Sequence, residues 1–258
     1  MQIERQYRLA LYDVDGTIVD SEPRNRKAIE TVARIGGYSI QKNDWDFLTG
    51  QGDDIIWELL VKEKPELKQV FNTASSFERA CLNEKINRIA EVKKLPEVDK
   101  SIKYFKEKNL EVAVVSNSVT GDATASLSYA GYQEKDFITS LFRDALRDAG
   151  LRAKPHPDPY LEALRRVNEI LKQKKQEQGE EFIEITPAEC LVLEDSKTGV
   201  RAGMAAGMTV IQITDENMPL DKNEAEQIQA THNGLYYPMK RAELMKFCKD
   251  ILTLPAPI

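Results

Sequence analysis

The chain has 258 residues, of which 41% are hydrophobic and 30% charged, and its 36 basic against 42 acidic residues give a formal net charge of −6. This composition is typical of a globular protein of one large or two modest domains and excludes a disordered or fibrous chain. The acidic excess argues against broad binding of nucleic acid or an anionic membrane, and no apolar run reaches the roughly 18 residues of a membrane span. The first eight residues lack the apolar stretch of a signal peptide. Three widely spaced cysteines, Cys81, Cys190 and Cys248, predict neither a disulfide framework nor a zinc ribbon, so we expect a reducing, cytoplasmic location.

Short apolar runs mark the predicted strands at residues 8–12, 111–116, 190–193 and 209–213. Several are apolar at successive positions, which is typical of strands that are covered on both faces. Helical patterns separate these runs along the chain. The sequence therefore predicts an α/β fold with a Rossmann-like parallel sheet.

The stretch between the first and second of these strands has a different character. Ala28, Ile29, Val32 and Ala33 follow a helical spacing that ends at Gly36, and further helices are predicted around residues 55–60 and from residue 67 to about 89. No strand pattern appears there. We predict a core of residues 1–19 and 98–258, with an all-helical cap of residues 20–97 inserted after the first strand.

The C-terminal half predicts one long helix. Asp158 is expected as its N-cap and Pro159 as its first helical residue, and residues 172–181 read as a solvated helix end closed by Gly179. Beyond residue 215 the helical signals are weak.

Two carboxylates, Asp13 and Asp15, directly follow the first predicted strand. In open α/β sheets the ligand crevice lies at the carboxyl ends of the strands. Carboxylates two residues apart repel each other unless a cation or a shared proton intervenes, and oxygen ligands suit Mg²⁺. The alternative is an acidic turn that merely ends the strand.

Three further groups follow later strands in the same way. Ser116 and Asn117 offer a hydroxyl and backbone N–H groups for an anion, Lys154 lies in a proline-rich turn before a helix, and Glu194 and Asp195 form a second acidic pair. Taken alone, each has a plain structural alternative: a helix cap, a solvent-facing lysine and a strand end.

Together the four groups resemble the motifs of the haloacid dehalogenase superfamily, which read DxDGT, Ser/Thr-Asn, Lys and an acidic pair in this order. Residues 8–20 and 110–213 carry the resemblance. The sequences Asp13-Val-Asp-Gly-Thr-Ile-Val-Asp-Ser-Glu22, Lys154-Pro-His-Pro-Asp-Pro-Tyr160 and Leu193-Glu-Asp-Ser196 look like the branch of beta-phosphoglucomutases and sugar-phosphate phosphatases.

The resemblance implies a role for each residue. Asp13 is the nucleophile that forms an aspartyl-phosphate, and Asp15 is the general acid and then the general base. Ser116, Asn117 and Lys154 bind the phosphate. Mg²⁺ is held by the Asp13 side chain, the Asp15 carbonyl and Asp195, with Glu194 reaching it through water. Thr49 and Gly50 resemble a cap loop that touches substrate, although a helix terminated by Gly50 explains them equally well.

Position 25 bears on the choice of reaction. Beta-phosphoglucomutases carry a cap histidine twelve residues after the nucleophile, and here that residue is Asn25, flanked by Arg24 and Arg26, which could contact a second anionic group of the substrate. We therefore expect a Mg²⁺-dependent phosphatase that acts on a small phosphorylated metabolite such as a sugar or polyol phosphate. A phosphomutase and a catalytically silent, partner-binding protein are the alternatives. The oligomeric state stays open, with a monomer possible.

Overall fold

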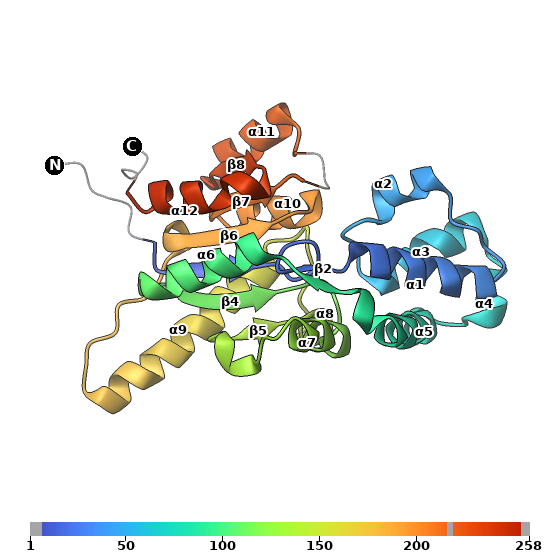
Figure 1. The fold of residues 1–258 in the computed structure, drawn as a ribbon, viewed down its shortest axis with the longest axis horizontal. Coiled ribbons are helices and arrows are strands. Elements are labelled where there is room, and N and C mark those ends of the chain that lie inside the picture. The colour runs from blue at the N-terminus through green and yellow to red at the C-terminus, as the bar shows by residue number, and fades with distance from the viewer. Residues whose placement is uncertain (1–6, 216–218, 254–258) are drawn as a thin grey trace.

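The computed structural model describes residues 7–215 and 219–253. In this part of the chain the main sheet consists of β1 (Leu9–Tyr12), β4 (Glu111–Val115), β5 (Ser140–Leu141), β6 (Cys190–Glu194), β7 (Thr209–Ile213) and β8 (Tyr236–Met239). The strand order is β5-β4-β1-β6-β7-β8 (Figure 1). All neighbouring pairs are parallel, which confirms the predicted α/β architecture. Because β1 is central and the chain builds the sheet outward on both of its sides, the crevice expected in such sheets lies beyond the end of β1.

Helices cover both faces of the sheet. One face carries α6 (Pro96–Glu107), α7 (Thr120–Tyr129) and α12 (Leu244–Ile251), and the other carries α8 (Arg143–Asp148), α9 (Asp158–Gln178), α10 (Lys197–Ala205) and α11 (Lys222–His232). Strand side chains alternate between the two layers: Ala10 and Tyr12 belong to one hydrophobic cluster, Leu9 and Leu11 to the other. All four are fully buried, so β1 is a rigid base for the residues that follow it.

A separate helical body lies to one side of the sheet (Figure 1). It consists of α1 (Glu22–Ile35), α2 (Trp45–Leu48), α3 (Asp53–Glu63), α4 (Leu67–Val70) and α5 (Ala74–Asn87), and it has a hydrophobic cluster of its own. The two-residue strands β2 (Val19–Asp20) and β3 (Lys93–Lys94) pair antiparallel where the chain enters and leaves it. We call these helices the cap; the predicted boundaries at 19/20 and 97/98 stay a prediction.

The cap differs from the prediction in two details. The single helix expected from residue 67 to about 89 is two helices, because Phe71 is extended and the Thr73 side chain accepts a hydrogen bond from the Ser76 N–H (3.2 Å) that starts α5. The strand-free insert does contain β3. A strand of two residues is too short to show an alternating pattern.

Three details of the core also differ. The short strand β5 and the edge strand β8 were not predicted. Helix α9 begins at Asp158 with Pro157 as its N-cap, because the Asp158 carboxylate accepts hydrogen bonds from the backbone N–H (3.0 Å) and Nε (3.1 Å) of Arg152. The helix then continues to Gln178, where Gly179 in the left-handed region (φ 69°) ends it as expected.

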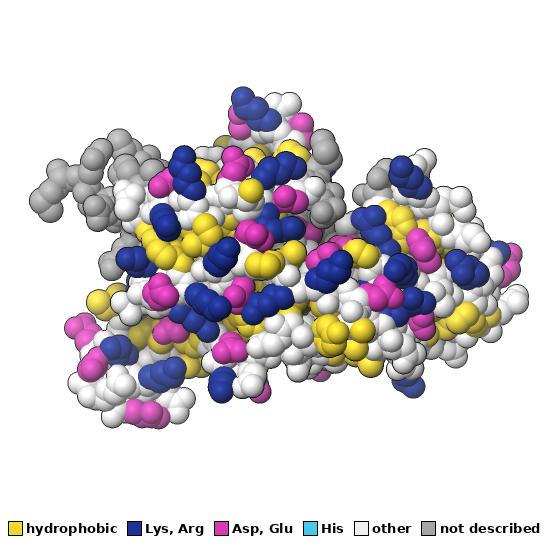
Figure 2. All heavy atoms as spheres, in the orientation of Figure 1, with side chains coloured by type: hydrophobic (Ala, Val, Ile, Leu, Met, Phe, Trp, Pro, Cys, Tyr) yellow, Lys and Arg dark blue, Asp and Glu magenta, His cyan; other side chains and the backbone are white. Residues whose placement is uncertain are grey.

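Basic and acidic side chains are interspersed over the face drawn in Figure 2. Among the described helices, none combines the length and the apolar composition needed to cross a membrane. The three cysteines are unpaired and buried, one in each hydrophobic cluster. Cys190 is thus a core residue.

Candidate active site

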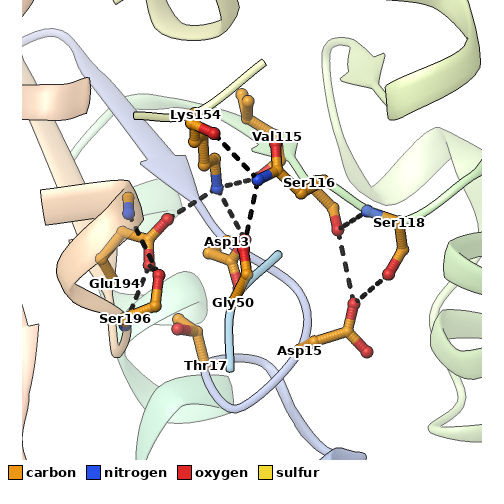
Figure 3. Close-up of polar contacts among 12 residues, drawn as sticks. Asp13, Asp15, Thr17, Gly50, Val115, Ser116, Ser118, Lys154, Glu194 and Ser196 are labelled. Carbon is orange, nitrogen blue, oxygen red and sulfur yellow. Dashed lines mark hydrogen bonds and ion pairs between the residues drawn. The ribbon is translucent and has the colours of Figure 1, made fainter. Parts of the chain in front are cut away.

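The predicted site residues come together at the carboxyl edge of the sheet (Figure 3). The parallel register pairs Tyr12 with Leu193, and the N–H of Asp13 donates to the Leu193 carbonyl (2.9 Å), so that Asp13 lies beside Glu194 and Asp195. Ser116 follows β4 directly. These loops and the cap helices line one pocket.

Among the described residues, Lys154 is the only cation in direct contact with Asp13. Its Nζ lies 2.7 Å from Asp13 Oδ1, 2.6 Å from Glu194 Oε1 and 2.8 Å from the Val115 carbonyl, which uses all three of its donors. Burial alone would lower the pKa of Lys154, but the carboxylates of Asp13 and Glu194 outweigh it and raise the pKa to about 12. Lys154 is therefore a fixed positive charge beside Asp13.

Glu194 is fully buried, and both of its oxygens have protein partners. Oε1 also accepts a hydrogen bond from the Tyr160 hydroxyl (2.8 Å), and Oε2 accepts from Ser196 Oγ (3.1 Å) and from the N–H groups of Asp195 and Ser196 (3.2 Å each). A Cβ on Gly199 would lie 1.7 Å from Oε1, so this packing requires glycine at that position. These contacts place Glu194 to orient Lys154 and the loop after β6.

Asp13, Glu194 and Asp195 form an acidic cluster in which one oxygen from each lies within 4.8 Å of the others. Burial, reinforced by neighbouring carboxylates, raises the pKa of Asp13 and of Asp195 well above the usual range. The turn after β1 comes very close to Asp195, because a Cβ on Gly16 (φ 78°) in that turn would lie 2.1 Å from Asp195 Oδ2. An all-oxygen set with unbalanced negative charge fits Mg²⁺.

Asp15 points away from Glu194, toward Ser116 and Ser118 (Figure 3). It accepts hydrogen bonds from the hydroxyls of Ser21 (2.5 Å), Ser118 (2.8 Å) and Ser116 (3.4 Å) and from Asn25 Nδ2 (3.3 Å). Burial would raise the pKa of Asp15, but the Arg24 charge and the serine hydroxyls outweigh it and lower the pKa. The surroundings of Asp15 thus favour its ionised form.

The remaining predicted residues join the cap to the core. Asn117 Nδ2 lies within hydrogen-bond distance of the carbonyls of Gly50 (3.3 Å) and Lys154 (3.4 Å), so its side chain bridges two loops. With the side chain engaged in this way, an anion would contact the backbone of Asn117 and not its amide group. Thr49 and Gly50 line the pocket, and the Thr49 hydroxyl donates to the Trp45 carbonyl (2.7 Å). Of the two arginines beside Asn25, Arg26 lines the pocket. Arg24 is fully buried, which corrects the expectation that it could contact substrate.

Sequence reasoning missed several partners in the site. Ser21 and Ser118 lie beside predicted residues, but a serine there reads equally well as a helix cap. Tyr160 lies in the first turn of α9, and only the fold shows that its hydroxyl meets Glu194. Glu22, which lines the pocket from the cap side, was named only within a motif and was given no role. Burial and the nearby Asp15 charge raise the pKa of Glu22 to about 7.

Comparison with known proteins agrees with this geometry. The haloacid dehalogenase-like hydrolase family matches residues 7–207. A phosphorylated carbohydrates phosphatase of Thermotoga maritima is 25% identical over 203 residues, 77% of this chain and 81% of that protein. A bifunctional riboflavin kinase/FMN phosphatase of Arabidopsis thaliana is 32% identical over 122 residues; the match covers 47% of this chain and only 27% of that longer protein.

Among solved structures, a beta-phosphoglucomutase from Clostridium difficile superposes with a TM-score of 0.72 at 16% identity and covers 96% of this chain and 97% of its own. At this identity the likeness concerns the fold alone. The family match confirms the expectation of an enzyme, and both curated relatives named here are phosphatases, at least in part. The site motifs lie within the matched residues, and the chain belongs to the haloacid dehalogenase-like hydrolase family.

Proposed function

We propose that the protein is a Mg²⁺-dependent phosphatase that hydrolyses a small phosphorylated metabolite, such as a sugar or polyol phosphate, through an aspartyl-phosphate on Asp13. The contact of Lys154 with both Asp13 and Glu194, beside Asp195, is the observation that carries this proposal. This contact supports the proposal because a positive charge beside Asp13 would lie next to the oxygen that attacks phosphorus. The carbohydrate-phosphate activity named for the Thermotoga relative supports the substrate class.

In the first half of the reaction, an Asp13 carboxylate oxygen forms a bond to phosphorus while the bond from phosphorus to the substrate oxygen breaks. The leaving oxygen takes its proton from Asp15. Lys154 and the backbone N–H groups after Ser116 offset the negative charge on the phosphoryl oxygens. Such electrostatic stabilisation, together with positioning, supplies most of the rate gain in phosphoryl transfer.

In the second half, a water oxygen bonds to phosphorus and its proton passes to Asp15. The bond between phosphorus and Asp13 breaks, which releases phosphate and restores the carboxylate. The lowered pKa of Asp15 keeps its carboxylate ionised, the state that can accept this proton, whereas the first half requires it to carry a proton.

Asp13 and Asp195 would hold Mg²⁺ directly with the Asp15 carbonyl, and Glu194 would contact a water of the ion. When bound, Mg²⁺ supplies positive charge that reduces the repulsion between the nucleophile and the phosphate. Asp195 is kept close to Asp13 by the glycine turn at Gly16.

A phosphate-release assay tests this proposal, with Mg²⁺ and after EDTA treatment. The panel comprises para-nitrophenyl phosphate, glucose 6-phosphate, fructose 1-phosphate, sorbitol 6-phosphate and FMN. We expect Mg²⁺-dependent release from para-nitrophenyl phosphate and at least one sugar or polyol phosphate. No release from any of them would contradict the proposal and favour a silent, partner-binding protein.

The phosphomutase alternative has a test of its own. Asn25 has no imidazole to relay a proton, so we expect the aspartyl-phosphate to lose its phosphoryl group to water. Glucose 1-phosphate with a trace of glucose 1,6-bisphosphate should yield inorganic phosphate or no product. Glucose 6-phosphate formed without phosphate release would establish a mutase instead.

A further inference from the structure

We propose that Asp122, Arg24 and Asn25 form a buried chain of hydrogen bonds that runs from the core through the cap and positions the carboxylate of Asp15. The inference rests on the proposed function, because it assigns a purpose to groups around the proposed acid/base. Within this series of three residues, Asp122 acts through Arg24 and Arg24 acts through Asn25. Asn25 is the member of the series that contacts Asp15.

The geometry fixes the orientation of the Asn25 amide. Arg24 donates to Asn25 Oδ1 through both Nε (3.1 Å) and Nη2 (2.6 Å). With its carbonyl oxygen turned toward the guanidinium, the amide directs Nδ2 toward Asp15 Oδ1 at 3.3 Å. The asparagine amide has both a carbonyl oxygen, which accepts a hydrogen bond from the arginine, and an NH₂ group, which donates one to the carboxylate.

Asp122 holds Arg24 in place from the core side. It lies in the first turn of α7 and is 1% exposed, and its Oδ1 accepts a hydrogen bond from Arg24 Nη2 (2.8 Å). Its other oxygen lies 3.2 Å from Lys85 Nζ of α5, which also pairs with Asp53 of α3 (2.8 Å). One core carboxylate thus ties down cations from two cap helices.

Stability alone does not explain this arrangement. Removing charged side chains from water costs so much that a buried ion pair often contributes no more than apolar packing would. Helix α1 already has an apolar anchor, since Ile29, Val32 and Ala33 belong to the hydrophobic cluster of the cap. The feature that apolar packing could not supply is a directed N–H donor at Asp15.

The leaving group of the substrate separates a positioning role from a structural one. An alkyl oxygen needs a proton from Asp15 to leave, whereas para-nitrophenolate leaves readily without one. The value of kcat/KM covers the steps up to release of the leaving group. We therefore compare kcat/KM for para-nitrophenyl phosphate with that for the fastest of glucose 6-phosphate, fructose 1-phosphate and sorbitol 6-phosphate.

The variants are Asn25→Ala, which removes the donor, and Arg24→Lys, which keeps the charge but cannot hold both partners in a fork. General acid catalysis contributes about 10²–10⁴-fold, so we expect the alkyl-to-aryl ratio of kcat/KM to fall by at least about tenfold in both. Arg34→Lys, in the exposed last turn of the same helix, should leave the ratio unchanged.

Both substrates are measured on the same preparation, so partial unfolding does not alter the ratio; if Arg24→Lys does not fold, Asn25→Ala decides. An equal fall for both substrates would overturn the positioning role and leave a structural one. A wild-type protein that hydrolyses neither substrate would overturn the proposed function, and this inference with it.

Discussion

At the scale of single residues, the three carboxylates of the acidic cluster outnumber the lysine that contacts them in the described part of the chain. Asp13, Glu194 and Asp195 face one another, while Lys154 contacts two of them. Such a cluster does not favour folding of the metal-free protein, because burial and mutual repulsion both oppose ionisation. The arrangement makes sense where a cation and an anionic substrate complete it.

Glu22, which lines the pocket from the cap side, offers a test of the pocket's electrostatics. Burial and the Asp15 charge raise its pKa from 4.5 to about 7. The folded protein therefore keeps this proton up to about pH 7, while the unfolded chain loses it near its ordinary pKa, so stability falls as the pH rises through this window. Glu22→Gln should raise the free energy of unfolding by about 1–3 kcal/mol at pH 8 and change it little at pH 4.

Urea unfolding at the two pH values measures this difference. Glu107→Gln, at the exposed end of α6, is the matched control and should have the same small effect at both. A Glu22→Gln protein that is no more stable than the wild type at pH 8 would contradict the raised pKa.

Sequence reasoning could name Asp13, Asp15, Glu194 and Asp195 because each lies at or near a point where a buried strand ends. Parallel strands bring such points to one edge, whatever the rest of the fold does. Lys154 could be named because it lies in a proline-rich turn before a helix and completes the order of the motifs. The pairs of Arg24 with Asp122 and of Tyr160 with Glu194 join residues 98 and 34 positions apart. No local pattern indicates such a contact, since it depends on how the cap and α9 pack.

At the scale of elements, the first turn of α10 packs so closely against Glu194 that position 199 has no room for a side chain. Alanine normally stabilises a helix relative to glycine, but a Cβ on Gly199 would lie 1.7 Å from Glu194 Oε1. Gly199→Ala must displace this carboxylate from Lys154 and Tyr160. We expect the free energy of unfolding to fall by about 2–4 kcal/mol and phosphate release to fall with it.

Gly121→Ala is the control, because Gly121 occupies an early turn of α7, where a Cβ would make an ordinary contact of 3.4 Å with Leu82. Its stability should be unchanged or higher by up to about 1 kcal/mol. Thermal and urea unfolding of both variants make the comparison. Equal effects at the two glycines would show that Glu194 is not held as described.

The length and burial of a strand decide whether it could be predicted from the sequence. Buried strands of four or five residues, such as β1 and β7, are visible as apolar runs. The two-residue strands β2, β3 and β5 are too short for any pattern to show. The edge strand β8 is only partly buried and contains Pro238, and proline is disfavoured in strands except at edges. Its pairing with β7 depends on the finished sheet.

At the scale of the whole molecule, the site lies where the sheet and the cap meet, and residues from both line one pocket. Metal binding to the carboxylate cluster should therefore stabilise the folded protein as a ligand does. Mg²⁺ at 100 times its Kd would add about 2.7 kcal/mol and raise Tm.

Asp195→Asn should remove most of this Mg²⁺-dependent rise, while Asp148→Asn, exposed at the end of α8, should keep it. Differential scanning fluorimetry with and without Mg²⁺ gives both shifts. Ca²⁺ prefers more and longer oxygen contacts, so it should raise Tm without supporting hydrolysis. An equal Mg²⁺ shift in wild type and Asp195→Asn would show that the ion binds elsewhere.

The central claim is that Asp13 carries the phosphoryl group between substrate and water. The most direct measurement is mass spectrometry of peptides from a reaction quenched in acid within the first turnover. We predict one added phosphoryl group on the peptide that contains Asp13, absent after EDTA treatment and absent in Asp13→Asn, which should be folded but inactive. Phosphate released at the wild-type rate by freshly purified Asp13→Asn, or a phosphoryl group on another residue, would contradict the account.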